Sequence, residues 1–79
     1  MTSLTENIAQ LHTTSMGIER IKRNLNIDTD PVEWCREAIL SENATLECRG
    51  KNYYVTAHGA VITVNASSLT IITAHRIKE

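Results

Sequence analysis

The apolar residues in the first half of the chain recur every three or four positions, which is the spacing of an amphipathic helix. The first stripe predicts a helix over residues 4–13, opened by a capping box from Ser3 to Glu6. Its buried residues would be Leu4, Ile8 and Leu11. The sequence therefore predicts a short first helix with one face on a hydrophobic core.

Capping residues predict two more helices. Thr14 or Ser15 can serve as the N-cap of a second helix, since their hydroxyls accept bonds from free N–H groups. Its buried residues would be Ile18, Ile21 and Leu25. Asp30 followed by Pro31 predicts the start of a third helix, because aspartate caps helices and proline suits the first helical position. This third helix is predicted to end at residues 41–43.

From residue 44 onward the hydrophobic period changes from 3.6 to 2, and β-branched residues become frequent. Short segments rich in Gly, Asn and Ser separate the alternating runs and predict turns. The predicted strands are Thr45–Arg49, Tyr53–His58, Ala60–Asn65 and Leu69–His75. Because the links are too short for a parallel crossover, the strands should form an antiparallel meander.

Alternation also assigns residues to the two faces of the predicted sheet. Val55 and Ala57 point to one face of the second strand, and Tyr54 and Thr56 point to the other. In the last strand both alternating sets contain apolar residues, so its orientation stays open. One face of the sheet should lie under the helices. The other, partly polar, fits either a binding surface or an ordinary solvated sheet face.

These elements predict an α+β fold in which two or three N-terminal helices pack on one face of a three- to four-stranded antiparallel β-meander. The 79 residues form a single domain, 1–79, with its helical part at 4–42 and its β-meander at 44–77. A domain of this size buries only about 60% of its unfolded surface. A functional site should therefore be shallow, or be completed by a second copy of the chain.

The cysteine pattern and the hydropathy narrow the class of protein. Cys35 and Cys48 form no Cys-x-x-Cys pair, so their spacing predicts neither a zinc site nor a disulfide framework, and we expect two buried free thiols. No metal and no cofactor is predicted. The chain has no apolar run of membrane-spanning length and no signal-peptide pattern. These features predict a cytoplasmic protein without a membrane partner.

Charge is unevenly distributed, although the net charge is only −1. Residues 28–47 hold six acidic side chains and one basic side chain, a net charge of −5, and the rest holds seven basic and three acidic, a net charge of +4. This separation fits a basic binding face, and it equally fits solvated helix faces.

Three groups of residues could carry chemistry. In the first, His12, Thr13 and Thr14 precede a helix that bears Arg20, and free N–H groups at a helix start attract anions. The structural alternative is that these residues only cap the two helices. The choice depends on whether their polar groups are free in the folded protein.

The second group is the run Lys51-Asn52-Tyr53-Tyr54, in which a predicted tight turn precedes an aromatic pair. A lysine and an amide can hold a phosphate while an aromatic ring stacks a base. The alternative is a turn followed by a strand with a half-buried tyrosine pair.

The third group is Thr73, His75 and Arg76 in the last strand. Histidine can act as a general acid or base near neutral pH, and arginine stabilises charge on a phosphate. The alternative is a solubilising end of the chain. None of the three groups forms a Gly-rich phosphate loop, a nucleophile elbow or a carboxylate pair.

Six segments of the chain carry a resemblance to known sequences: Leu11–Thr14, Gly17–Leu25, Val32–Cys35, Gly50–Val55, Ile62–Ala66 and Thr70–Arg76. Together they resemble a family of short bacterial proteins of unknown function over nearly the whole chain. This resemblance implies no particular activity.

Helices followed by a meander with a basic, histidine-bearing last strand are also similar to the barnase, EndoU, colicin and RelE-like group of nucleases. This resemblance implies metal-independent cleavage of RNA with the ribose 2′-hydroxyl as the nucleophile, and basic, histidine and hydroxyl residues on one sheet face. The chain departs from that group because no His or Glu aligns with its general base.

The first functional hypothesis is therefore a metal-independent ribonuclease-like domain acting on RNA phosphodiesters. His75 would be the catalytic acid or base and His12 its partner, which requires the two side chains to meet across a helix–sheet cleft. The residues proposed to bind the substrate or its phosphate are Thr13, Thr14, Arg20, Lys51, Tyr54, Asn65, Thr73 and Arg76.

Two alternatives belong to other functional classes. The same polar residues could bind a nucleotide or another phosphate-bearing ligand without turnover, as a sequestering or inhibitory protein of the phage anti-defence type. The chain could instead be a small protein-interaction module that uses its acidic third helix or basic second helix. The partners implied are RNA or a nucleotide, a second copy of the chain, or a protein target.

Overall fold

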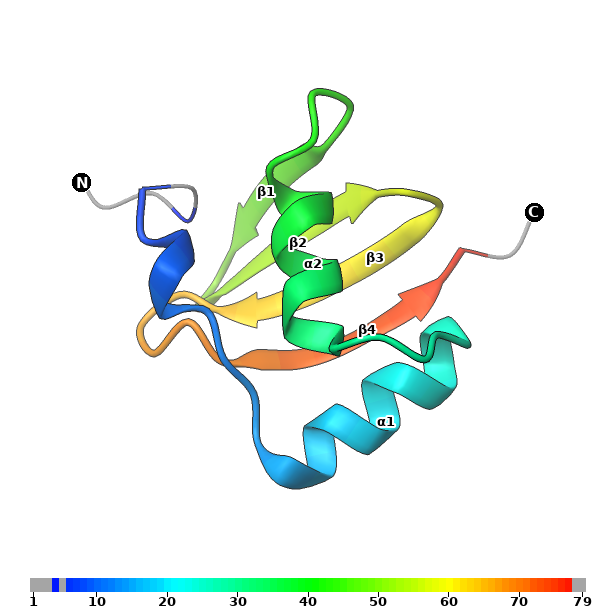
Figure 1. Cartoon of the computed structure of the whole chain (residues 1–79). Coiled ribbons are helices and arrows are strands. Elements are labelled where there is room, and N and C mark those ends of the chain that lie inside the picture. Colours follow the sequence, from blue (N-terminus) through cyan, green and yellow to red (C-terminus); the bar gives the residue numbers. More distant parts are fainter. Residues whose placement is uncertain (1–3, 5, 78–79) are drawn as a thin grey trace.

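A four-stranded antiparallel sheet, with the strand order β1-β2-β3-β4, forms one layer of the protein, and two helices pack on one of its faces (Figure 1). The structure, a computed structural model, describes residue 4 and residues 6–77. The elements are a 3-10 turn η1 (Ile8–Gln10), helices α1 (Ser15–Leu25) and α2 (Pro31–Ile39), and strands β1 (Thr45–Arg49), β2 (Asn52–Ala57), β3 (Ala60–Asn65) and β4 (Ile71–Arg76). The predicted α+β class is confirmed, with two helices and four strands in the described residues.

The predicted first helix over 4–13 is wrong. Among the described residues it is replaced by the 3-10 turn, after which Leu11 is extended, with φ −61° and ψ 131°. The backbone of His12 then bonds to the last strand, because its N–H donates to Leu69 and its carbonyl accepts from Ile71. This long-range pairing replaces the helical hydrogen bonds. Ser3, the predicted cap, lies outside the described residues.

The apolar stripe of that segment nevertheless reaches the core. Leu4 is 0% exposed and Leu11 is 4% exposed, and Ile8 packs against the core cluster. The spacing of apolar residues therefore predicted burial correctly and backbone conformation incorrectly.

Helix α1 begins after Thr14, one of the two predicted N-caps. The Thr14 hydroxyl accepts a hydrogen bond from the Gly17 N–H at 3.0 Å, which is the expected N-cap bond. At the other end Asn26 is left-handed, with φ 56°, and the Ile27 N–H donates to the Lys22 carbonyl. Helix α1 is therefore capped at both ends.

Helix α2 also follows its predicted cap. Asp30 Oδ1 accepts from the Val32 N–H at 2.9 Å, and Pro31 occupies the first helical turn. Glu33 pairs with Arg36 one turn later. The helix ends at Ile39, earlier than the predicted 41–43.

The turns between strands have the expected residue types. Gly50, at φ +60°, is the first central residue of the two-residue β1–β2 turn, a position that favours glycine. His58 and Gly59 form the β2–β3 turn with φ of 51° and 69°, so His58 belongs to a turn rather than to the predicted strand. The His58 ring lies 5.9 Å from the Trp34 ring of α2, which places this turn against the helix.

Strand β4 contains a bulge that resolves its orientation. Thr63 pairs with Thr73 and Val64 pairs with Ile71, so Ile72 is an extra residue. Ile71 and Ala74 are both buried, although neither predicted alternating set contains both. The extra residue shifts the alternation in the middle of the strand.

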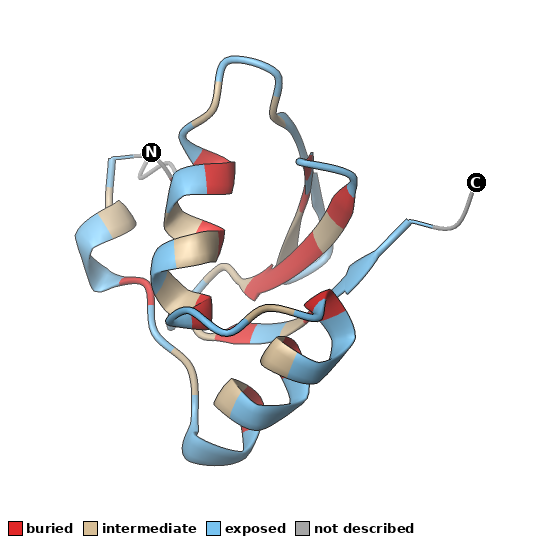
Figure 2. Ribbon diagram, turned by 45° about the vertical axis from the view of Figure 1, so that its right-hand side comes forward, coloured by how far each residue is buried: buried red, intermediate tan, exposed pale blue. Residues whose placement is uncertain are grey.

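The core lies between the two helices and the sheet. Figure 2 shows buried residues on the helices and on the central strands, while the outer surfaces are exposed. Its fully buried side chains include Ile21 and Leu25 from α1, and Val55 and Ile62 from the sheet. In the described part of the chain, neither helix has the length and the apolar character needed to cross a membrane.

The two cysteines have different environments, and one of them differs from the expectation. Cys35 of α2 is buried, whereas Cys48 is exposed, as are the other four residues of β1. Burial raises the pKa of the Cys35 thiol from 9.0 to about 12, since a buried thiolate loses its hydration. Cys35 is therefore an unreactive thiol in the folded protein.

This difference predicts how thiol chemistry and stability depend on pH. In the native protein at about pH 8, a thiol reagent should modify Cys48 and leave Cys35 unmodified until the protein unfolds. In the unfolded chain the Cys35 thiol ionises near pH 9, but in the folded chain it ionises near pH 12. This thiol therefore should not change the free energy of unfolding below about pH 9 and should lower it as the pH rises toward 12.

The measurement is chemical unfolding of the wild type and of Cys35→Ala at about pH 8 and about pH 10.5. The alanine variant should have a lower free energy of unfolding than the wild type at both pH values, because it loses buried atoms. Between about pH 8 and about pH 10.5, however, its free energy of unfolding should fall less than that of the wild type. Equal losses would show that Cys35 does not carry the effect.

Candidate functional site

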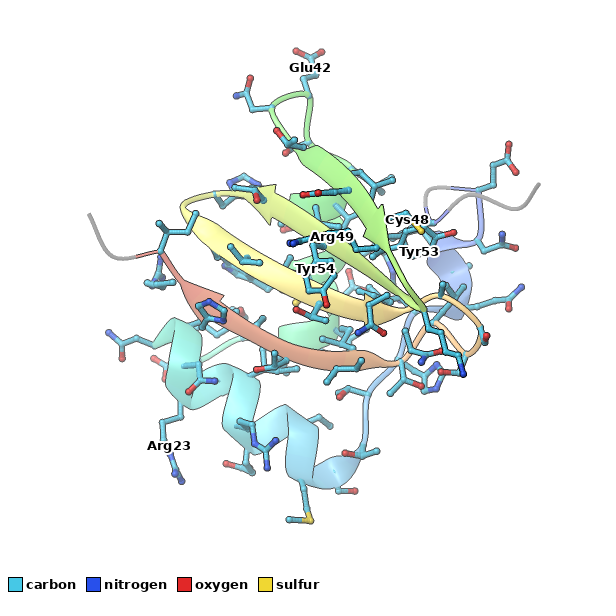
Figure 3. All side chains as sticks on the ribbon, turned by 180° about the vertical axis from the view of Figure 1, so that it is seen from behind. Arg23, Glu42, Cys48, Arg49, Tyr53 and Tyr54 are labelled. Atoms are coloured by element: carbon cyan, nitrogen blue, oxygen red, sulfur yellow. The ribbon has the colours of Figure 1, made fainter. Side chains whose placement is uncertain are left out.

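The face of the sheet that the helices leave uncovered carries most of the polar residues brought together by the fold. Figure 3 views this open face from in front, with Arg49 and Tyr54 lying together over the strands. Strand register places Glu47, Tyr54, Thr63 and Thr73 in one row across the sheet. A parallel row is formed by Arg49, Asn52 and Asn65.

Arg49 and Tyr54 form the best-defined contact on the open face. The guanidinium carbon of Arg49 lies 4.6 Å from the centroid of the Tyr54 ring, within cation–π range. Arg49 Nε also lies 3.3 Å from Glu47 Oε1. The Asn52 side-chain amide lies 3.5 Å from the Tyr54 hydroxyl. A flat ring, a planar cation and an amide donor therefore share one exposed surface.

A chain of hydrogen bonds continues this surface into the β3–β4 turn. Asn65 Oδ1 accepts from the N–H groups of Ser67 and Ser68 at 2.9 and 3.0 Å, which holds the turn. Ser68 Oγ lies 2.7 Å from Thr70 Oγ1, and Thr70 Oγ1 lies 3.0 Å from His12 Nε2. Side chains from two distant parts of the sequence are thereby connected.

The position of His12 follows from its backbone pairing beside Thr70. Its Nδ1 lies 2.9 Å from the Gln10 carbonyl, which can only accept, so Nδ1 carries a proton. In the neutral ring Nε2 then accepts from the Thr70 hydroxyl, and in the charged ring Nε2 donates to it. Gain of a proton by His12 would therefore reverse the Thr70 hydroxyl and turn it toward Ser68.

The two turns at this end of the sheet are bonded to one another. The Ala66 N–H donates to the Lys51 carbonyl at 2.8 Å, so the exposed Lys51 lies beside the Asn65–Thr70 connection. We call the surface from Tyr54 to His12 the polar strip. It comprises Arg49, Lys51, Asn52, Tyr54, Asn65, Ser68, Thr70 and His12.

The structure does not bring His12 and His75 together. His12 is bonded beside Thr70 at the start of the last strand, and His75 lies opposite Val61 near its end. His75 is five positions after Thr70 along the strand, which is roughly 15 Å. Both ring nitrogens of His12 have partners, whereas among the described residues His75 makes no side-chain hydrogen bond. The two-histidine catalytic pair is not assembled.

Several of the other predicted site residues have structural partners. The Thr13 hydroxyl donates to the Ile71 carbonyl at 3.0 Å, and the Thr14 hydroxyl caps α1. Arg76 Nε donates to the Leu25 carbonyl at 2.8 Å and so satisfies an end of α1. Arg20 is exposed on α1 rather than on the strands of the open face. These four residues do not form one site.

Four of the eight predicted binding residues, Lys51, Tyr54, Asn65 and Thr73, lie on or beside the open face. The prediction did not include Arg49. The sequence did contain the signal, because a two-residue turn at Gly50 and Lys51 puts Arg49 opposite Asn52. Alternation then places Arg49 on the Tyr54 face.

Within the described ranges, no three His, Cys, Asp or Glu side chains lie together in a way that could hold a metal ion. The fold and the polar strip define a small α+β domain with one helix-covered and one open sheet face. The chain belongs to the family described as "Protein of unknown function (DUF3781)", whose family model matches residues 5–75. No curated protein and no solved structure matches the chain.

Proposed function

We propose that the open face binds a nucleotide unit without cleaving it, either in single-stranded RNA or as a free nucleotide. The observation that carries this proposal is the Arg49 guanidinium 4.6 Å above the Tyr54 ring on an uncovered sheet. Aromatic rings and guanidinium planes are the surfaces on which unstacked bases stack. Sequence-tolerant binding of this kind needs no pocket, which suits a small domain.

The rest of the polar strip supplies the contacts that a phosphate and a ribose require. Lys51 is exposed in the turn beside the strip and provides a cation for a phosphate oxygen. Asn52 and Asn65 are paired directly across neighbouring strands. Because the strands are about 4.8 Å apart, Arg49 and Asn65 span about 10 Å. Lys51 lies beside the Asn65 end of this span, because its carbonyl accepts from the Ala66 N–H. The stacking surface of Arg49 and Tyr54 is therefore close to the Lys51 cation.

A binding function is favoured over the ribonuclease hypothesis by the position of the histidines. General acid–base cleavage by two histidines needs both within reach of one phosphodiester. His12 and His75 lie at opposite ends of β4, and His12 has both ring nitrogens engaged. His75 is exposed and could act without His12. The experiment must therefore also detect RNA cleavage that depends on His75 alone.

The experiment measures binding of a fluorescent single-stranded RNA pool and of nucleoside monophosphates to the purified protein, by anisotropy and by competition. Tyr54→Ala should weaken RNA binding roughly tenfold or more, because loss of one stacked base costs about 1–3 kcal/mol. Tyr54→Phe keeps the ring and should bind nearly as the wild type does. If the two variants bind alike, base stacking on Tyr54 is excluded.

A matched pair of variants tests the cation. Arg49→Ala should weaken binding and lower its salt dependence. Arg23→Ala removes another exposed cation, from α1, and should change neither (Figure 3). Intact RNA recovered from the complex supports binding without turnover. RNA fragments that disappear in His75→Ala would overturn it in favour of a ribonuclease, and absence of any complex would reject both.

A further inference from the structure

The two edges of the sheet are protected differently. The start of the last strand is bonded by the backbone of His12, at Leu69 and Ile71, and α1 runs beside β4 (Figure 1). At the other edge, β1 bonds to β2 alone among the described strands, and all five of its residues are exposed. An exposed edge with unpaired N–H and C=O groups is a template for another strand.

The turn between β1 and β2 determines which backbone groups of β1 are free. Arg49 and Asn52 close a two-residue turn, so their N–H and C=O groups point toward each other. In an antiparallel ladder this direction alternates along the strand. The backbone groups of Leu46 and Cys48 therefore point away from β2, toward the open edge.

The side chains of β1 offer different chemistry on its two faces. Leu46 is 46% exposed and Cys48 is exposed, and both lie on the helix side of the sheet, where Cys48 is opposite Tyr53 (Figure 3). Glu47 and Arg49 lie on the open face with opposite charges. The edge is therefore apolar on one side and carries one charge of each sign on the other.

We propose that β1 pairs antiparallel with β1 of a second copy of the chain, with Cys48 of one copy opposite Cys48 of the other. A two-fold axis perpendicular to the sheet keeps every residue on its own face. Pairing centred on Cys48 places Glu47 of each copy opposite Arg49 of the other, and opposite charges directly across a strand pair attract. The two sheets become one continuous sheet.

The charges select this register over its neighbours. Pairing centred on Glu47 would place two glutamates opposite each other, which is destabilising. Pairing centred on Leu46 would bring Glu47 opposite Thr45 and leave both charges without an opposite charge across the pair. Only the register centred on Cys48 satisfies both pairs of charges. The contact is isologous, because both copies use β1, so the assembly closes at two copies.

The first test measures mass as a function of protein concentration by sedimentation velocity. The wild type should dimerise reversibly, and Glu47→Arg alone or Arg49→Glu alone should raise the dimer dissociation constant at least about tenfold. The double variant exchanges both charges and should restore the wild-type constant within about threefold. Arg23→Glu makes the same charge change on α1 and serves as the control.

Two outcomes would overturn the proposal. One is a wild type that remains monomeric at about 1 mM, where a contact with even a weak dissociation constant would be populated. The other is a dimer that does not respond to the charge variants or is not restored by their combination. Circular dichroism of each variant shows whether it is folded before its mass is compared.

The second test uses Cys48 as a reporter of register. In a hydrogen-bonded antiparallel pair the two Cα atoms are about 5.5 Å apart, within the span of a disulfide. Glutathione disulfide can accept the two electrons, so two thiols form one disulfide and two glutathione molecules are released. Cross-linked dimer should form in the wild type and should be absent in Cys48→Ser, which keeps the buried Cys35.

The charge variants should affect this cross-linking in the same order as the dissociation constant. Glu47→Arg should slow formation of the Cys48 disulfide, and the double charge exchange should restore its rate. A non-covalent dimer that forms no Cys48 cross-link would exclude the proposed register. RNA-binding measurements do not enter either test, so dimerisation stands or fails independently of the proposed function.

Discussion

Replacing Ile62 with alanine should lower the free energy of unfolding by about 2–5 kcal/mol. Ile62 is 0% exposed in the middle of β3, where it lies between Val55 on one neighbouring strand and Ala74 on the other. The shorter side chain removes buried apolar atoms and leaves a cavity that a closely packed sheet cannot fill. A domain of this length is stable by roughly 4–12 kcal/mol, so the loss would be a large part of the total.

Ile72 provides a matched control, because the same substitution there removes the same atoms from a surface. It is 43% exposed at the bulge of β4, so Ile72→Ala should cost less than about 1 kcal/mol. The measurement is urea unfolding followed by circular dichroism, with the two slopes compared to confirm a two-state transition. Similar losses at the two positions would mean that Ile62 is not at the centre of the core.

Gly17→Ala should destabilise the protein by about 1–3 kcal/mol, although alanine favours helices over glycine by about 1 kcal/mol. Gly17 is buried in the first turn of α1, and a Cβ atom there would lie 2.3 Å from the Thr13 hydroxyl oxygen and 3.2 Å from the Thr14 hydroxyl oxygen. The Thr13 hydroxyl is held by its bond to the Ile71 carbonyl. The new methyl group must therefore displace a bonded side chain.

A double-mutant cycle separates this clash from other effects of the substitution. Thr13→Ala removes the oxygen that the new Cβ would meet and costs one hydrogen bond, about 0.5–1.5 kcal/mol. In the Thr13→Ala background, Gly17→Ala should be much less destabilising, or stabilising through helix propensity. Additive losses would show that the two residues do not interact and that glycine is required there for another reason.

The elements with local signals were predictable from the sequence. These signals act over a few residues: the N-caps at Thr14 and Asp30, and the glycines of the turns. Helices α1 and α2 and the turns form where those residues predict them. The period of two in the second half predicted a meander of three to four strands, and the described sheet is a four-stranded meander. The ends of strands were less accurate, because His58 adopts a left-handed turn conformation that alternation does not reveal.

The errors arose where distant parts of the chain compete with local preference. The apolar residues before α1 have helical spacing. The backbone of His12 nevertheless pairs with Thr70 at the start of the last strand, 58 positions later in the sequence. No local pattern indicates such a pairing. For the same reason the sequence could propose His12 and His75 as partners without showing that His12 lies beside the start of the last strand and His75 near its other end.

The candidate site was predictable where it depends on strand alternation, and not where it depends on long-range bonds. Alternation assigned Tyr54 and Asn65 to faces of their own strands, and the strand register puts both on the open face. The face of Thr73 stayed open in the sequence, because both alternating sets of the last strand contain apolar residues, and the register places Thr73 opposite Thr63. The structural roles of Thr13 and Arg76 depend on carbonyl groups of Ile71 and Leu25, which the fold brings near. The sequence alone does not show that the Thr13 hydroxyl and Arg76 Nε are used in bonds to backbone carbonyls.

The bulge in β4 has a consequence for how relatives of this chain can differ in length. Ile72 is the one residue of the strand without a counterpart in β3. A chain that lacked it would run from Ile71 directly to Thr73 with regular alternation, and every following side chain would keep its present face. A single-residue deletion elsewhere within a paired strand would exchange core and surface positions. An alignment gap at this position is therefore compatible with an unchanged sheet.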